Sequence, residues 1–140
     1  MTAQQIAHKK YLNSQRELAS DKAVELRVFA SITSKMRAAD TNEIGGMSKL
    51  AEALYDNVKL WNLLLIDLTN PENPLPLDLK TSIISLSEFT QKHTVKVMAG
   101  RATHDVLIDI NQAMIDGLRQ SRSIQAMANN QTHEQEIEAA

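Results

Sequence analysis

Of the four histidines in this chain, His93 and His104 lie within the helical part of the sequence and are the first candidates for catalysis or metal binding. His104 is followed directly by Asp105, but neighbouring side chains diverge on a helix, and no His or carboxylate lies three or four residues after His104. We therefore expect His104 to be a surface residue of a first helical turn rather than a metal ligand or a general base. His93 falls on an apolar helical stripe, where we expect a buried or half-buried ring that is held by a hydrogen bond.

Nucleophilic and phosphate-binding motifs are the next candidates. Ser82, Ser85 and Ser87 lie inside a helical pattern, without the sharp turn and the oxyanion donors that a serine hydrolase needs. Gly45 and Gly46 are not followed by the Lys-Ser/Thr pair of a phosphate-binding loop. The chain has no cysteine, which excludes a thiolate zinc site, a cysteine nucleophile and a disulfide framework. We expect no enzyme activity, no catalytic residue, no cofactor and no metal.

Size and charge restrict the function further. The chain has 140 residues, enough for one domain with a single core. Its formal net charge of −2 argues against direct nucleic-acid contact, although residues 1–40 are mildly basic and suit an acidic partner. The longest apolar run, Leu63 to Ile66, is too short to cross a membrane, and the first twenty residues show no secretory signal. We expect a cytoplasmic protein without a membrane partner.

Glycine and proline divide the chain into long helical segments. No run of alternating β-branched residues suggests a strand, so the pattern predicts an all-α fold. The breaks lie at Gly45-Gly46, at Pro71–Pro76 and at Gly100, the expected C′ residue of the third helix. With Ser20 and Thr103 as N-caps, the four main helices of a compact bundle are predicted at 21–39, 47–68, 77–99 and 104–127. Residues 3–18 leave room for an extra N-terminal helix.

The domain organisation follows from where these helices end. We expect an N-terminal arm at residues 1–19 that orders only when packed, a helical domain at 20–128, and an acidic disordered tail at 129–140. Mid-helix Gly117 costs about 1 kcal/mol relative to Ala, which predicts close approach of another helix. The third helix is expected to bury one stripe, formed by Leu79, Ile83, Leu86, Thr90, His93 and Val97.

The most hydrophobic helical segment is the candidate partner-binding element. From Leu60 onward its residues are apolar nearly all round, which indicates packing on more than one side. Trp61, the lone tryptophan, is expected in the core rather than as an interface anchor. The large apolar area of this segment is equally consistent with burial in a tightly packed core and with contact to a partner helix. The candidate partner-binding residues are Leu60, Trp61, Leu63, Leu64 and Ile66.

An ordered set of segments resembles a known family. Three segments carry most of the likeness: Leu60-Trp61-Asn62-Leu63-Leu64-Leu65-Ile66-Asp67-Leu68 with Asn73-Pro74-Leu75-Pro76, Ile83-Ile84-Ser85-Leu86-Ser87-Glu88-Phe89, and Leu107-Ile108-Asp109-Ile110-Asn111-Gln112-Ala113-Met114-Ile115-Asp116-Gly117-Leu118. Upstream, Glu25-Leu26-Arg27-Val28-Phe29 is similar to a Glu-Tyr-Arg-Leu-Phe stretch, with Leu26 in place of the aromatic. Over roughly residues 20–120 the chain resembles the FlaF family of flagellar biosynthesis regulators of alphaproteobacteria.

The resemblance implies a cytoplasmic regulator that is needed for flagellin production and export. It implies flagellin as the partner, which the protein would bind as a secretion chaperone, and the regulator FlbT as a second candidate partner. It implies no catalytic residue and no cofactor. The alternative is a post-transcriptional regulator that acts on flagellin messenger RNA, directly or through FlbT. A chaperone needs an exposed apolar groove, whereas an RNA-binding regulator needs a clustered basic face.

Overall fold

The computed structural model describes residues 2–120, with side chains for 2–7 and 26–120. The predicted all-α fold is confirmed: α1 spans Ala3–Ala38, α2 spans Gly46–Thr69, α3 spans Leu77–Met98, and a further helix occupies residues 105–120. No strand occurs among the described residues. The predicted stretch of the last helix beyond residue 120, and the predicted acidic tail, lie outside the described residues.

Helix α1 begins much earlier than the sequence pattern predicts. Thr2 is its N-cap, with a capping box in which Thr2 and Gln5 bond to each other's backbone N–H. The predicted start at residue 21, with Ser20 as N-cap, is therefore wrong. Residues 3–18 are not an extra helix but the first half of α1, because no glycine or proline interrupts the chain before Gly45.

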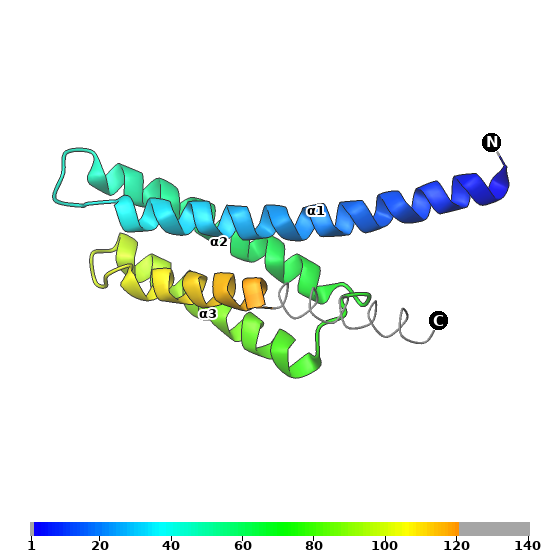
Figure 1. The fold of residues 1–140 in the computed structure, drawn as a ribbon. Helices are drawn as coiled ribbons and strands as arrows, with labels where there is room; N and C mark the ends of the chain where they lie inside the picture. The colour runs from blue at the N-terminus through cyan, green and yellow to red at the C-terminus, as the bar shows by residue number, and fades with distance from the viewer. Residues whose placement is uncertain (1, 121–140) are drawn as a thin grey trace.

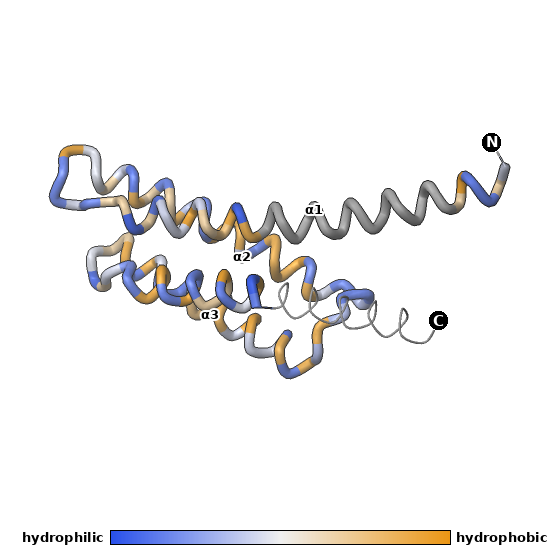
Figure 2. Tube along the Cα trace, in the orientation of Figure 1, coloured by the Kyte–Doolittle hydropathy of each residue, from blue (hydrophilic) through white to orange (hydrophobic). Residues whose placement is uncertain are grey.

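The length of α1 determines the shape of the molecule. α1 has 36 residues and α2 has 24, so at a rise of about 1.5 Å per residue α1 is about 18 Å longer. The two helices are antiparallel neighbours joined by the loop at residues 39–45, and the N-terminal half of α1 extends past the rest of the bundle (Figure 1). Hydrophobic and hydrophilic residues alternate in bands along α2 and α3, as amphipathic helices require (Figure 2).

The glycines at the helix ends have distinct roles. Gly45 is the N-cap of α2 and has a φ of 77°, in the left-handed region. Gly46 is buried, and a Cβ there would overlap the carbonyl oxygen of Asp40. Gly100 (φ 74°) is the C′ residue of α3, as predicted: its N–H donates to the Val97 carbonyl, and the Arg101 N–H donates to the Lys96 carbonyl. These two bonds form a Schellman motif.

The core is centred on Trp61 of α2. Its side chain is 0% exposed, which confirms its predicted core position. The Phe29 ring of α1 meets it edge to face, with ring centroids 5.9 Å apart. The other large apolar side chains that are fully buried are Met36, Leu50, Leu54 and Leu107. The core therefore joins α1, α2 and the helix at 105–120.

Helix α3 contributes an unusually polar face to this core. Its buried residues are Ile83, Ser87, Thr90, Thr94 and Val97. The predicted stripe is rotated relative to this face: Leu79 is exposed, while Leu86 and His93 are only half-buried. Serine and threonine are small, so this face lets α3 approach α2 closely. A prediction from hydropathy alone instead places the leucine-bearing side of α3 in the core.

The helix at 105–120 differs from expectation at two points. His104 precedes its first turn, and the His104 carbonyl accepts from the N–H groups of Leu107 and Ile108, so the N-cap is His104 rather than Thr103. The prediction that Gly117 marks close approach of another helix is also wrong. Gly117 is exposed, and no described atom would lie within 4 Å of a Cβ added there.

Candidate partner-binding groove

The predicted partner-binding residues fall into two groups. Leu60 and Trp61 are buried and Leu64 is half-buried, so these three side chains belong wholly or largely to the core. Leu63 and Ile66 are 66% and 67% exposed. Of the five predicted residues, therefore, the structure leaves Leu63 and Ile66 free to meet a partner and uses Leu60 and Trp61 for packing.

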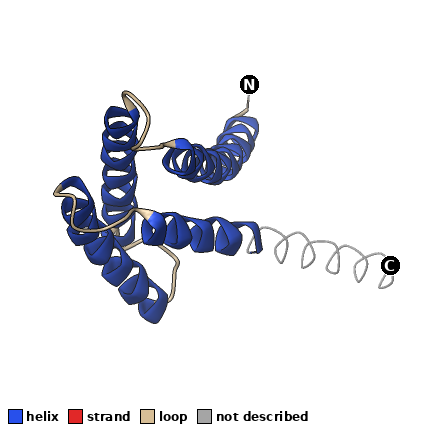
Figure 3. Ribbon diagram, turned by 90° about the vertical axis from the view of Figure 1, so that its left-hand side faces the viewer, coloured by secondary structure: helices blue, strands red, loops and turns tan. Residues whose placement is uncertain are grey.

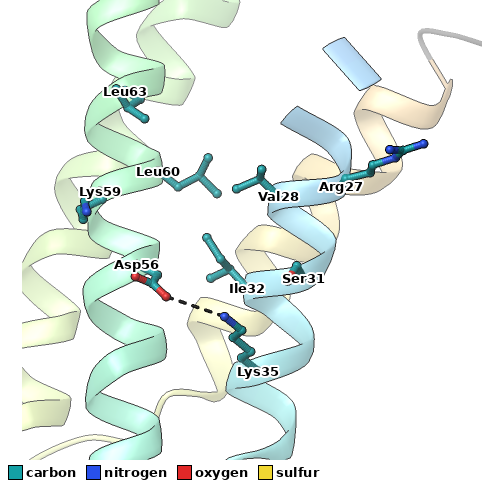
Figure 4. A pocket seen from close by; sticks show the side chains of 9 residues that line it. All are labelled: Arg27, Val28, Ser31, Ile32, Lys35, Asp56, Lys59, Leu60 and Leu63. Atoms are coloured by element: carbon teal, nitrogen blue, oxygen red, sulfur yellow. Dashed lines mark ion pairs between the residues drawn. The ribbon is translucent and has the colours of Figure 1, made fainter. Parts of the chain in front are cut away.

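A groove lies beside Leu63, between α1 and α2 (Figure 4). Leu60 of α2 points toward Val28 of α1 across the space between the two helices, and Ile32 of α1 lies below this pair in the view of Figure 4. The groove has a volume of about 500 Å³, within the range of about 300–1,000 Å³ that ligand pockets occupy. Its lining residues are Arg27, Val28, Ser31, Ile32, Lys35, Asp56, Lys59, Leu60 and Leu63.

The edges of this groove carry mostly positive charge. The lining contains three cations, Arg27, Lys35 and Lys59, and one carboxylate, Asp56. The Lys35 ammonium lies 4.0 Å from the Asp56 carboxylate and joins α1 to α2 at one end of the groove (Figure 4). The Lys59 ammonium lies 5.1 Å from the centre of the Tyr55 ring. The groove is thus apolar along its floor and basic along its edges.

The half of the groove on α1 is what sequence reasoning missed. Val28 and Ile32 stand four residues apart on one apolar stripe of α1, and such a stripe is normally assigned to the core. In the structure Ile32 is buried, but Val28 is 36% exposed. The available signal was the cluster of cations around this stripe, since Arg27 and Lys35 flank it in the sequence.

A second, smaller hollow lies on the opposite side of α1. It has a volume of about 230 Å³ and lies against the helix at 105–120. Arg37 donates to the Gln112 side-chain oxygen at 2.7 Å, and Gln112 in turn donates to Asp116 at 3.0 Å. These side-chain bonds bridge the two helices, so this hollow is part of a polar helix contact. Figure 3 shows α1 lying in the angle between α2 and this helix.

His93, His104 and Ser87 occupy structural positions. A ring nitrogen of His93 lies 2.7 Å from the Thr103 carbonyl oxygen, and the ring stacks on Phe89, which confirms the predicted half-buried, hydrogen-bonded histidine. His104 is half-buried instead of lying on the surface, and its Nε2 is 2.9 Å from the Met36 carbonyl oxygen of α1. Ser87 is fully buried on α3. No group of three His, Cys, Asp or Glu residues suited to a metal ion occurs in the described part of the chain.

The fold and the groove define an all-helical domain with a partly apolar groove between α1 and α2. None of the helices within residues 2–120 has the length and apolar character needed to cross a bilayer.

The family model described as "Flagellar protein FlaF" matches residues 7–118, and the chain belongs to the FlaF family. The match begins earlier than the resemblance over residues 20–120 suggested and includes most of the first half of α1. Neither the curated proteins nor the solved structures contain a significant match to the chain.

Proposed function

We propose that this FlaF-family protein binds flagellin in the cytoplasm as a secretion chaperone and so promotes flagellin production and export. The observation that supports this most directly is the groove between α1 and α2, which leaves apolar side chains of both helices open to solvent. Family membership supplies the flagellar context. Val28 of α1 and Leu63 of α2 line the same groove and are both exposed, and a gathering of exposed apolar side chains is typical of a binding surface.

The physical task of such a chaperone suits a groove of this kind. A client segment that is disordered before assembly must be ordered on binding, which costs free energy and keeps the net affinity moderate. An apolar floor supplies enough attraction to prevent aggregation of the client. The moderate affinity lets the export machinery remove the client without an energy-consuming release step on this chain.

The test is to measure binding of purified monomeric flagellin to the full-length protein at low and high salt. Attraction through apolar surface should change little between about 50 and 500 mM salt, since the exposed charge pairs contribute only about 0–1 kcal/mol each. Direct binding to RNA would weaken by orders of magnitude over the same range. The same titration with the flagellin messenger RNA leader therefore separates this proposal from the post-transcriptional alternative.

Each outcome has a definite meaning. Flagellin binding that persists at high salt supports the chaperone role. Absence of flagellin binding at both salt concentrations contradicts it. A steep loss with salt would mean that the basic residues, rather than the apolar floor, carry the contact. Repeating the titration with FlbT added tests whether that second candidate partner changes the affinity for flagellin.

A further inference from the structure

The groove between α1 and α2 has features that specify what kind of segment it receives. We infer that it takes one amphipathic helix of the client, about two turns long at the contact, whose apolar stripe is flanked by acidic side chains. This inference rests on the proposed client-binding function and adds to it the site and the chemistry of the bound segment.

The dimensions indicate the length of the contact. The lining residues of α2 run from Asp56 to Leu63, which at about 1.5 Å per residue is about 10 Å, or roughly two helical turns. The Lys35–Asp56 ion pair stands at one end of the groove, and Leu63 stands toward the other (Figure 4). A bound helix would therefore lie along α1 and α2 and present two or three successive apolar side chains.

The floor indicates the apolar stripe. Leu60 and Ile32 are buried beneath it, while Val28 is 36% and Leu63 is 66% exposed. A third helix laid against two crossing helices would cover these exposed methyl groups in the way that helix-in-groove complexes do. Ile66, which is 67% exposed and lies three residues after Leu63, extends the apolar surface beyond the groove.

The edges indicate the flanking charges. Arg27 on α1 and Lys59 on α2 stand on opposite sides of the floor, and their side chains point away from it (Figure 4). Among the lining residues that the structure describes, the one carboxylate, Asp56, is already next to Lys35. Acidic side chains on both sides of the bound stripe would meet these cations, whereas basic ones would be repelled.

The acidic end of this chain is a poorer occupant than a client helix. Its carboxylates, Glu134, Glu136 and Glu138, alternate every second residue, with Ile137 as the one large apolar residue among them. On a helix Glu134 and Glu138 share a face and Glu136 lies on the opposite one, while a single large apolar residue forms no stripe with steps of three and four residues. The charge pattern of the tail suits the edges of the groove, but the tail cannot cover the floor.

The experiment uses the full-length protein and two labelled synthetic peptides. Both carry leucine at steps of three and four residues; one has glutamate on each side of the stripe, and the other has lysine at the same positions. We expect the glutamate peptide to bind at least about tenfold more tightly at low salt, since like charges at the edges oppose the lysine peptide. Equal affinities, or no binding of either peptide, would overturn the inference.

Matched substitutions locate the site. Leu63→Glu places a carboxylate at the floor, whereas Val95→Glu changes a residue of α3 that is equally exposed, both being 66% exposed. We expect Leu63→Glu to weaken the glutamate peptide and flagellin by about tenfold or more, the effect of losing one buried leucine contact, and Val95→Glu to leave both unchanged. Lys59→Glu should reduce the preference for the glutamate peptide, and Lys92→Glu on α3 should not. The emission of the lone tryptophan verifies that each variant is folded.

The outcomes test the groove inference and the chaperone proposal separately. If flagellin binds and Leu63→Glu has no effect, the groove is not the site, while the chaperone proposal stands. If the glutamate peptide binds and flagellin does not, the groove inference stands and the chaperone proposal is wrong. If removal of residues 129–140 strengthens peptide binding, the tail competes for the groove, and the client is not its sole occupant. A dimer that dissociates when the peptide is added would show that a second copy occupies the groove, which contradicts the inference.

Discussion

The indole N–H of Trp61 donates a hydrogen bond to the side-chain oxygen of Asn111 at 3.0 Å, across a core that is otherwise mainly apolar. The Asn111 amide group then donates to the side-chain oxygen of Asn57 at 2.8 Å. Both asparagines are fully buried. This chain of bonds links α2 to the helix at 105–120, so two fully buried asparagines also determine how that helix docks.

Asn111→Ala should destabilise the protein by about 2–4 kcal/mol, because it leaves the Trp61 N–H and the Asn57 oxygen buried without partners. Asp109→Ala, on the exposed side of the same helix, is the matched control and should cost under about 0.5 kcal/mol. Urea unfolding followed by tryptophan emission measures both variants. Similar stabilities for the two would show that the bonds to Asn111 do not hold the helix in place.

On α3, Ile83→Ala should be more costly than Leu86→Ala. Ile83 is 5% exposed, and emptying such a site costs about 2–5 kcal/mol. Leu86, although it stands on the predicted stripe, is only half-buried, so we expect about 1–2 kcal/mol for its truncation. The midpoints of urea unfolding of the two variants show which substitution lowers the stability more. A reversed order would mean that α3 is rotated relative to the structure described above.

Gly46 and Gly117 should respond to alanine in opposite directions. Gly46→Ala forces its Cβ against the Asp40 carbonyl oxygen, and this backbone cannot yield without moving the loop at 39–45. We expect a loss of at least about 1 kcal/mol, the order of cost for strained or overpacked sites. Gly117→Ala should stabilise the helix by about 0.5–1 kcal/mol, because alanine restricts the unfolded chain and no described atom obstructs its methyl group. Thermal unfolding compares both with the wild type, and a destabilised Gly117→Ala would indicate a packing role there.

Removal of residues 1–19 should leave the domain folded. Among the residues of α1 whose side chains the structure describes, the buried ones are Phe29, Ile32, Thr33 and Met36, and all lie in the part of the helix that remains. We expect a fall in melting temperature of less than about 8 °C, the effect of roughly 1 kcal/mol in a domain of this size. A larger fall would place the first half of α1 in the core. Flagellin binding measured on the same variant tests whether this half, most of which lies within the family match, serves the client.

Removal of residues 129–140 should change the melting temperature even less. This segment contains Ile137 as its single large aliphatic residue and offers little apolar surface for packing. The deletion also provides the control for the longer N-terminal truncation, since both remove a chain end. A marked loss of stability would mean that the end of the chain packs against the bundle.

Several features followed from the sequence because they depend on local chemistry. Gly100 ends α3 in a left-handed conformation that glycine adopts without strain, and the proline-rich segment at 71–76 separates α2 from α3. The absence of strand patterns predicted the all-α fold. Trp61 was assigned to the core because a large apolar residue on the most hydrophobic helix has few other places to go.

Other features depended on contacts between residues far apart in the chain. Ser20 resembles an N-cap in isolation, but the helix that follows the N-cap Thr2 continues through it, since an N-cap residue begins a helix only where the preceding residues adopt another conformation. In the sequence, Gly117 cannot be distinguished from a glycine that allows two helices to approach closely. Only the positions of the neighbouring helices show that none of their described atoms lies near Gly117.

The groove is the clearest case of a feature that only the tertiary structure decided. Leu60, Leu63 and Val28 are equally apolar in the sequence, yet their exposed fractions are 8%, 66% and 36%. Hydropathy indicates that all three side chains favour burial. The crossing of α1 and α2 determines which of the three become buried, because two helices that diverge leave a strip of each apolar face without a partner.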